Sequence, residues 1–346
     1  MNMLAAVFHG PDDLRVEQVP RPSLPKGGLV MQTRTVGICG SDVRTWHSGN
    51  HRFSGSQILG HEMGGIVAES DLEAYLVGTP ITVCPCVPCL ECASCLSGHQ
   101  NFCRSRKCFG YQRPGGMAEA MAVPEDAMRA SCVVRVPDSI PLDYAPLAET
   151  LHSILNGQDR ARTSLMESVL VLGLGPVGIL HVAVASSRGA RPVLGVDPLE
   201  QRVEAACQVL GRERVLHMGE GWEKRARELT EGHGWDVVVI ANVARASVAT
   251  AFSLVAPMGR IVAYAGLRAD APRVDVDWND VHYRQIEIIG SFGGTPVYFQ
   301  AAVNWLATSN LPLDRLVTSE FPIERTLEAF KAVENGVGIK TVLRLS

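Results

Sequence analysis

The chain has 346 residues. This length exceeds that of most domains with a single hydrophobic core, so we expect two domains. Its 46% hydrophobic and 20% charged residues are typical of an ordinary globular protein. A formal net charge of -4 gives no electrostatic basis for binding nucleic acid or an anionic membrane, and no apolar run is long enough to span a bilayer. The start of the chain lacks the pattern of a signal peptide, so we expect a cytoplasmic protein whose closely spaced thiols bind metal rather than form disulfides.

Up to about residue 145, short β-type runs are separated by glycine and proline. They predict strands at residues 4–8, 14–19, 28–36, 64–67, 81–83 and 117–123. This pattern is typical of a compact β-barrel or sandwich rather than of stacked helices.

Beyond that point, apolar strands alternate with segments of helical length. The strands are predicted at 168–172, 192–197, 214–218, 236–241, 260–265 and 286–290, with helices between them at 198–210 and 222–230. Such alternation indicates a parallel sheet covered on both faces. The last segment holds helices at 297–309 and 325–335 and a strand at 340–345, and we expect it to return to the first domain. The predicted limits are therefore 1–145, 146–290 and 291–346.

A cysteine and a histidine in the first domain are each flanked by glycine, in Gly37-Ile38-Cys39-Gly40 and Gly60-His61-Glu62. Either residue alone is more often a buried core residue than a metal ligand. A thiolate and an imidazole on two separate turns, with a carboxylate beside them, favour zinc with one coordination position left open.

A glycine-rich turn follows the strand at 168–172 and precedes a helix. Its glycines allow a tight turn, the approach of a pyrophosphate and close packing of helix on strand. The candidate cofactor-binding residues of the turn are Gly173, Gly175, Pro176, Val177 and Gly178. Asp197 ends the next strand, where it would accept hydrogen bonds from an adenosine ribose and favour NAD, or else would cap the following helix. Arg202, one turn later, leaves NADP open.

A cluster of four thiols lies within fifteen residues, at Cys89, Cys92, Cys95 and Cys103. This spacing suits a closed tetrahedral zinc that holds a lobe of about 84–108 in shape, with an iron–sulfur cluster or a disulfide knot as alternatives. Two further thiols, Cys84 and Cys86, lie just upstream and complicate the assignment. We expect the remaining cysteines to be buried or free thiols, namely Cys108, Cys132 and Cys207.

Taken together, these motifs resemble those of the zinc-dependent medium-chain dehydrogenases, the alcohol and polyol dehydrogenase group. The resemblance rests on Gly37–Asp42, Gly60–Glu62, the four-cysteine lobe, and Gly173–Gly178 with Asp197. It implies an α/β fold, in which a GroES-like β-barrel catalytic domain is completed by the C-terminal segment and a doubly wound Rossmann domain is inserted. It also implies two zinc ions per chain, one catalytic and one structural, NAD as cofactor, and a homodimer or homotetramer.

The same resemblance assigns roles around the open zinc. Cys39 and His61 correspond to catalytic zinc ligands, and Glu149 to a third ligand that some sugar and polyol members use. Glu62 is either a carboxylate beside the ligands or an exchanging ligand, and Asp42 orients His61 through its second ring nitrogen.

Ser41 is placed by the resemblance to accept the substrate proton. Many relatives continue this proton path with a histidine where the chain has Arg44, which cannot deprotonate, so the path must end on water, His47 or His51. Ser291–Gly294 lacks the arginine with which some polyol members hold hydroxyls, which argues against a simple linear polyol.

We therefore expect an NAD-dependent secondary-alcohol dehydrogenase acting on a small sugar, polyol or cyclitol, in either the alcohol or the ketone direction. An amino-alcohol or simple-alcohol dehydrogenase of the same family is the nearest alternative. A zinc-ribbon nucleic-acid-binding module and a non-catalytic zinc- and nucleotide-binding protein are alternatives of other classes, and the acidic charge balance argues against the first of these.

Overall fold

The computed structural model describes residues 1–53, 55–267 and 271–345. The chain divides into two compact units: Met1–His152 with the segment from Gly294 onward, and Ser153–Gly293. The first division falls inside α4 (Leu147–Arg160), whose opening turn belongs to unit 1, rather than at the composition change near residue 145.

Unit 1 is built mainly from antiparallel strands. One sheet has the order β2-β1-β4, formed by Asp13–Pro20, Asn2–Gly10 and Gln57–Ile58. The largest sheet has the order β10-β6-β5-β3-β18-β17, formed by Val133–Arg135, Pro80–Val83, Glu62–Ser70, Leu29–Gly37, Lys340–Arg344 and Val317–Pro322, and β9 (Ala120–Val123) also pairs with β3. The helices of this unit, apart from the first turn of α4, are α1 (Gly40–Ser48), α2 (Ala93–Leu96), α3 (Glu125–Arg129), α10 (Pro296–Thr308), α11 (Leu313–Leu316) and α12 (Thr326–Glu334).

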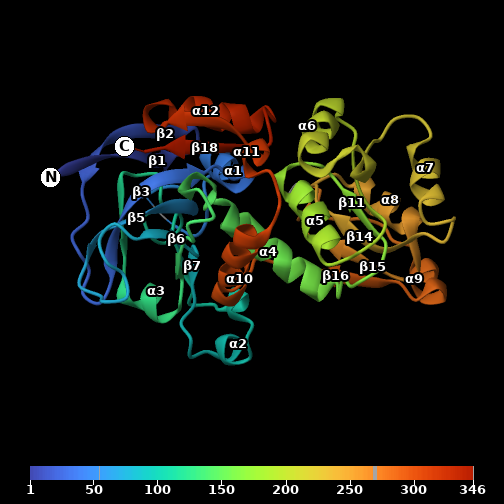
Figure 1. Ribbon diagram of the computed structural model, residues 1–346, viewed down its shortest axis with the longest axis horizontal. Helices are drawn as coiled ribbons and strands as arrows, with labels where there is room; N and C mark the ends of the chain where they lie inside the picture. The colour runs from blue at the N-terminus through green and yellow to red at the C-terminus, as the bar shows by residue number, and fades with distance from the viewer. Residues whose placement is uncertain (54, 268–270, 346) are drawn as a thin grey trace. The chain divides into compact units, whose positions relative to one another are not determined.

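The C-terminal segment completes unit 1. Strand β18 pairs antiparallel with β3 and parallel with β17, so it occupies an interior position of the sheet. Helix α12 packs against β18 and α1, and Figure 1 shows these red elements lying beside the blue N-terminal strands. The strand is buried continuously from Lys340 to Leu343, as expected for a strand covered on both faces.

Unit 2 is a six-stranded parallel sheet with the order β13-β12-β11-β14-β15-β16. Its strands are Val215–His217, Val193–Asp197, Val169–Leu172, Trp235–Ile240, Val255–Ala263 and Glu287–Gly290, and its helices are α5 (Pro176–Ser187), α6 (Glu200–Leu210), α7 (Trp222–Glu228), α8 (Ala246–Leu254) and α9 (Trp278–Arg284). The central strand β11 is buried throughout and β14 is buried except at Asp236, as expected for a sheet with helices on both faces. The expected doubly wound architecture is confirmed.

The prediction that Cys108 is a free thiol is wrong. Cys86 and Cys108 form a disulfide across the short antiparallel pair β7 (Cys86–Val87) and β8 (Lys107–Cys108). The two residues face each other in this ladder although they are 22 positions apart in the chain, a distance over which spacing alone gives no pairing. Within the described ranges, no helix has the length and apolarity needed to cross a membrane.

Candidate active site

Three potential metal ligands of unit 1 converge at one point. Cys39, His61 and Glu62 each offer a ligand atom, and these atoms lie within 4.8 Å of one another. Cys39 directly precedes α1, whereas His61 and Glu62 stand at the start of β5, the strand next to β3. A thiolate, an imidazole nitrogen and a carboxylate form a donor set that fits zinc and leaves a fourth position for a substrate or water.

Asp42 ties the two ligand-bearing segments together. Its Oδ2 accepts the Cys39 N–H at 2.9 Å, which fixes the first turn of α1, and its Oδ1 lies 3.0 Å from His61 Nδ1. Because the carboxylate accepts, Nδ1 carries the proton and Nε2 keeps its lone pair for a metal. Burial disfavours the charged imidazole, but the charges of Asp42 and Tyr111 and the hydrogen bonds to Asp42 and Cys39 together raise the pKa of His61 well above its usual value. The predicted orienting contact of Asp42 is thus present in the structure.

Glu62 is held by a buried lysine that the sequence did not point out. Lys340, at the start of β18, donates to Glu62 Oε1 at 2.6 Å, and the two side chains form an ion pair. Glu62 is 0% exposed and Lys340 is 4% exposed. Burial raises the pKa of Glu62, and the ammonium of Lys340 opposes that shift. Gly37 makes room for the carboxylate, since a Cβ there would lie 2.0 Å from Glu62 Oε2.

Glu149 lies near the three converging ligands but is not part of their group among the described residues. It stands in the first turn of α4, and burial raises the pKa of its carboxyl while the charges of His61 and Lys340 lower it. The negative charge of Glu149 also raises the pKa of Glu62. The site therefore contains two buried carboxylates whose charges interact, and Glu62 is the one grouped with the thiolate and the imidazole.

Ser41 stands between His61 and an aromatic hydroxyl. Its Oγ lies 3.4 Å from His61 Nε2 and 3.2 Å from the hydroxyl of Tyr111. Of the two histidines considered for the end of the proton path, His47 is exposed and already contacts Asp12 at 2.6 Å and Glu334 at 2.9 Å, and His51 is exposed. No sequence motif pointed to Tyr111, which lies 70 residues from Ser41 in the chain.

The four thiols of the lobe also converge, with all four sulfur atoms within 4.8 Å of one another and in no disulfide. The Sγ atom of Cys89 lies 3.9 Å from that of Cys95 and 3.5 Å from that of Cys103. A tetrahedral ion with bonds of about 2.3 Å to sulfur places its ligands about 3.8 Å apart. Backbone N–H groups of Glu91 and Cys92 lower the pKa of Cys89 to about 6, which favours the thiolate. The arrangement therefore fits one zinc ion rather than a disulfide knot.

The glycine-rich turn of unit 2 lies where the sequence placed it, between β11 and α5. A Cβ at Gly178 would lie 1.8 Å from the carbonyl oxygen of Gly173, so only glycine allows helix α5 to approach the strand this closely. Gly175 has no heavy atom within 4 Å of the position of a Cβ, and Pro176 and Val177 begin the helix behind it. Open space before a helix N-terminus fits a pyrophosphate.

Asp197 ends β12 and is 1% exposed. Its Oδ2 accepts the N–H of Leu174 in the glycine-rich turn and its Oδ1 accepts the N–H of Leu199, both at 2.9 Å. Asp197 does not cap α6, whose N-cap residue is Leu199 and has no side-chain cap, and each carboxylate oxygen retains a second lone pair. Arg202 lies 3.6 Å from Asp197 Oδ2, so part of its positive charge is neutralised in the structure.

Comparisons with known proteins agree with this fold. The sequence model described as zinc-binding dehydrogenase matches residues 176–308, and that described as alcohol dehydrogenase GroES-like domain matches residues 25–138. An erythritol/L-threitol dehydrogenase of Mycolicibacterium smegmatis is 30% identical over 353 residues, covering 96% of this chain and 95% of that protein. The sorbitol dehydrogenase of Homo sapiens is 28% identical over 358 residues, covering 99% and 96%. A solved oxidoreductase/dehydrogenase of unknown specificity from Escherichia coli has a TM-score of 0.91 at 23% identity, covering 100% of both chains, which shows the shared fold.

A GroES-like domain with this donor set and a Rossmann domain with this turn define a zinc-type oxidoreductase. The chain belongs to the zinc-dependent medium-chain dehydrogenases, as its sequence resemblance predicted.

Proposed function

We propose that this protein is an NAD-dependent zinc polyol dehydrogenase, which moves a hydride between a secondary hydroxyl of a sugar, polyol or cyclitol and NAD. The observation that carries the proposal is the convergence of Cys39, His61 and Glu62 within 4.8 Å, beside the hydroxyl of Ser41. Relatives named for erythritol, threitol and sorbitol support a polyhydroxylated substrate.

In this proposal Cys39, His61 and Glu62 hold the catalytic zinc, and Glu149 supplies a second carboxylate that exchanges with Glu62 or joins it. The bound ion supplies Lewis acidity that makes a substrate hydroxyl easier to deprotonate. Lys340 neutralises Glu62, so that the site does not gather an excess of buried negative charge.

Ser41 is the group placed to receive the substrate proton during oxidation, since its Oγ lies 3.4 Å from the His61 nitrogen that faces the ion. Arg44 is exposed and permanently charged, and His47 is held by two carboxylates. The proton therefore leaves towards water or His51 rather than through these two side chains.

Unit 2 binds NAD through the glycine-rich turn, with Asp197 directed at the adenosine ribose. Its carboxylate repels the extra phosphate of NADP, and the pairing of Arg202 with Asp197 reduces the attraction of that arginine for the phosphate. The four-cysteine lobe holds the second zinc. We also propose a homodimer or homotetramer, because Trp278, Tyr283 and Ile288 are more than half exposed on α9 and the edge strand β16.

The test is NADH formation by zinc-loaded protein with linear polyols, sugars, cyclitols, a polyol phosphate, threonine and simple secondary alcohols, with NADP in parallel. We expect turnover with polyhydroxylated substrates, a preference for NAD and two zinc ions per chain. Cys39→Ala should remove one zinc and abolish turnover. Cys132→Ala changes a buried thiol of the same unit that belongs to neither group of metal ligands, so this variant should keep its zinc content and its turnover. Turnover confined to simple alcohols or threonine would refute the substrate class.

A further inference from the structure

Tyr111 contacts the Ser41 hydroxyl from the short turn at 108–113. Its own hydroxyl lies 3.2 Å from Ser41 Oγ, and its ring packs against the His61 ring with centroids 5.5 Å apart. Tyr111 is 9% exposed and carries the guanidinium of Arg52 over its ring at 5.1 Å. Once His61 Nε2 binds a metal, that nitrogen has no lone pair left to accept a hydrogen bond. Tyr111 is then the partner that fixes the rotation of the Ser41 hydroxyl.

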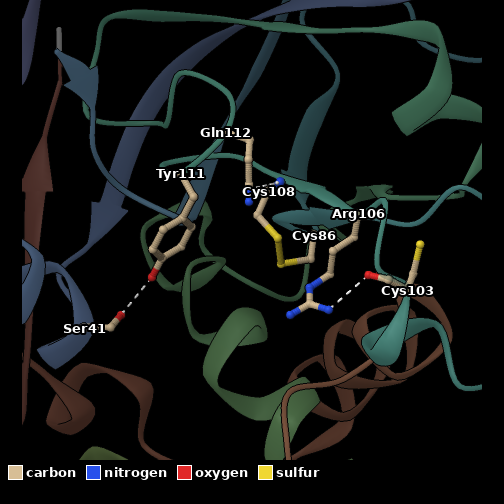
Figure 2. The surroundings of a disulfide bond; sticks show 7 residues. All are labelled: Ser41, Cys86, Cys103, Arg106, Cys108, Tyr111 and Gln112. Carbon is tan, nitrogen blue, oxygen red and sulfur yellow. Dashed lines mark hydrogen bonds between the residues drawn. A yellow bond between two sulfur atoms is a disulfide. The ribbon is translucent and has the colours of Figure 1, made fainter. Parts of the chain in front are cut away.

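The turn that carries Tyr111 closes on Cys108. The Cys108 carbonyl accepts the N–H of Tyr111 at 3.2 Å and that of Arg113 at 3.1 Å. The Cys108 N–H donates to Gln112 Oε1 at 3.0 Å, and the side chain of Gln57 donates to the Tyr111 carbonyl. Figure 2 shows Tyr111 pointing from this turn towards Ser41, with Cys108 at its base.

The disulfide fixes Cys108 in turn. It joins Cys108 to Cys86 (Figure 2). The N–H of Phe109 also donates to the carbonyl of Pro85 at 2.9 Å, so the base of the turn is tied to the segment that carries Cys86. Cys108 is 1% exposed, whereas Cys86 is partly exposed and open to a reductant. The four-cysteine lobe lies between the two half-cystines in the chain, so the same bond closes its base.

We propose that the Cys86–Cys108 disulfide and Tyr111 form one positioning unit of the active site, in which the disulfide holds the turn, the turn holds Tyr111, and Tyr111 orients Ser41. Reduction of the disulfide loosens the turn and lowers turnover while both zinc ions stay bound. The kinetic part of this proposal rests on the proposed dehydrogenase function, whereas the structural part does not.

The redox step is an exchange with a dithiol reductant. One thiolate of the dithiol attacks the Cys86 sulfur, the S–S bond breaks, and Cys108 leaves as a thiolate that takes up a proton. The second thiol of the reductant then displaces Cys86, so that two protein thiols form and the dithiol becomes a cyclic disulfide. Two electrons and two protons pass from the reductant to the protein.

The experiment uses a phosphine reductant, because a dithiol also chelates zinc. The phosphine reduces the disulfide to two thiols and takes one oxygen from water. Released thiols, bound zinc, amide hydrogen exchange of the peptide around 108–113, and kcat and KM are measured before and after reduction. The test variants are Tyr111→Phe and the double variant Cys86→Ser/Cys108→Ser. Two control variants accompany them. Tyr75→Phe removes a tyrosine hydroxyl that is hydrogen-bonded elsewhere in unit 1, and Cys207→Ser removes a partly exposed thiol of unit 2.

We expect reduction to release two thiols, leave both zinc ions in place, speed exchange at 108–113 and lower kcat about 3- to 10-fold with little change in KM, the range of one lost hydrogen bond. Tyr111→Phe should lower kcat by a similar factor, and its kcat should not fall further when the disulfide is reduced. The double serine variant should show the same lower kcat and the same lack of response to the reductant. Both controls should keep the full response. Unchanged exchange after two thiols appear overturns the structural part, and a full reduction effect in Tyr111→Phe shows that the disulfide does not act through Tyr111. Absence of turnover in every variant, with faster exchange on reduction, refutes the proposed function instead.

Discussion

Replacing Lys340 by methionine tests how much the buried ion pair between Lys340 and Glu62 stabilises unit 1. Methionine keeps an unbranched side chain one atom shorter and removes the charge, which leaves Glu62 at 0% exposure beside the carboxylate of Glu149. Removing one partner of a buried pair costs about 3–5 kcal/mol of unfolding free energy. For a unit of this size, each kcal/mol shifts Tm by about 2–4 °C, so we expect a loss of about 6–20 °C.

The assay is thermal unfolding followed by circular dichroism, with zinc and with a chelator. Lys331→Met, which removes an exposed lysine from α12 of the same unit, is the matched control and should stay within about 0.5 kcal/mol of the unmodified protein. Adding Glu62→Gln to Lys340→Met should restore part of the loss, because no unpaired charge is then buried. If Lys340→Met unfolds at the same temperature as Lys331→Met under both conditions, the ion pair between Lys340 and Glu62 does not stabilise the folded protein.

Other changes test the second carboxylate, the cofactor site and the buried histidines. Glu149→Ala should abolish turnover without changing NAD affinity measured by titration, and unchanged turnover would remove it from the site. Asp197→Asn keeps the shape and removes the charge, so the ratio of kcat/KM for NADP to that for NAD should rise about 10-fold or more; an unchanged ratio would mean that the charge does not select the cofactor. Burial lowers the pKa of His152 to about 4 and that of His181 to about 3. Both imidazoles therefore stay neutral in the folded protein, whereas in the unfolded chain they take up protons below pH ~6.5. Stability should therefore fall with acidification, by about 1 kcal/mol per histidine between pH 7 and 5.5, and His181→Gln should flatten the slope in urea titrations while exposed His51→Gln should not.

The parts of the site that could be predicted from the sequence are those whose residues stand close together in the chain. Cys39, Asp42 and His61 lie in short glycine-flanked segments, and the contact between Asp42 and His61 follows once the two segments meet. The alternation of strands and helices in unit 2 likewise sufficed for its six strands, because a parallel sheet imposes one regular pattern.

The parts that could not be predicted depend on which strands become neighbours. Lys340 reaches Glu62 because β18 pairs with β3. The sequence of β18 does not by itself predict which strand it will pair with. Tyr111 reaches Ser41 through a turn closed by side-chain and backbone hydrogen bonds rather than by a regular element. The Cys86–Cys108 bond was missed because the cysteine spacing favoured metal binding throughout the lobe, and only the register of β7 and β8 separates this pair from the zinc ligands.

The interior position of β18 has a consequence for how the chain matures during synthesis. Lys340 lies 278 residues after Glu62, so at translation rates of roughly 5–20 residues per second the carboxylate waits about 14–56 s for its counter-charge. During that interval the end of β3 at residues 35–37 lacks its β18 partner, while the residues of unit 2 form one uninterrupted stretch that is able to fold first. A ribosome stalled shortly before β18 would therefore carry a folded unit 2 and a metal site without its lysine, and the incomplete sheet of unit 1 could pair with strands of other chains.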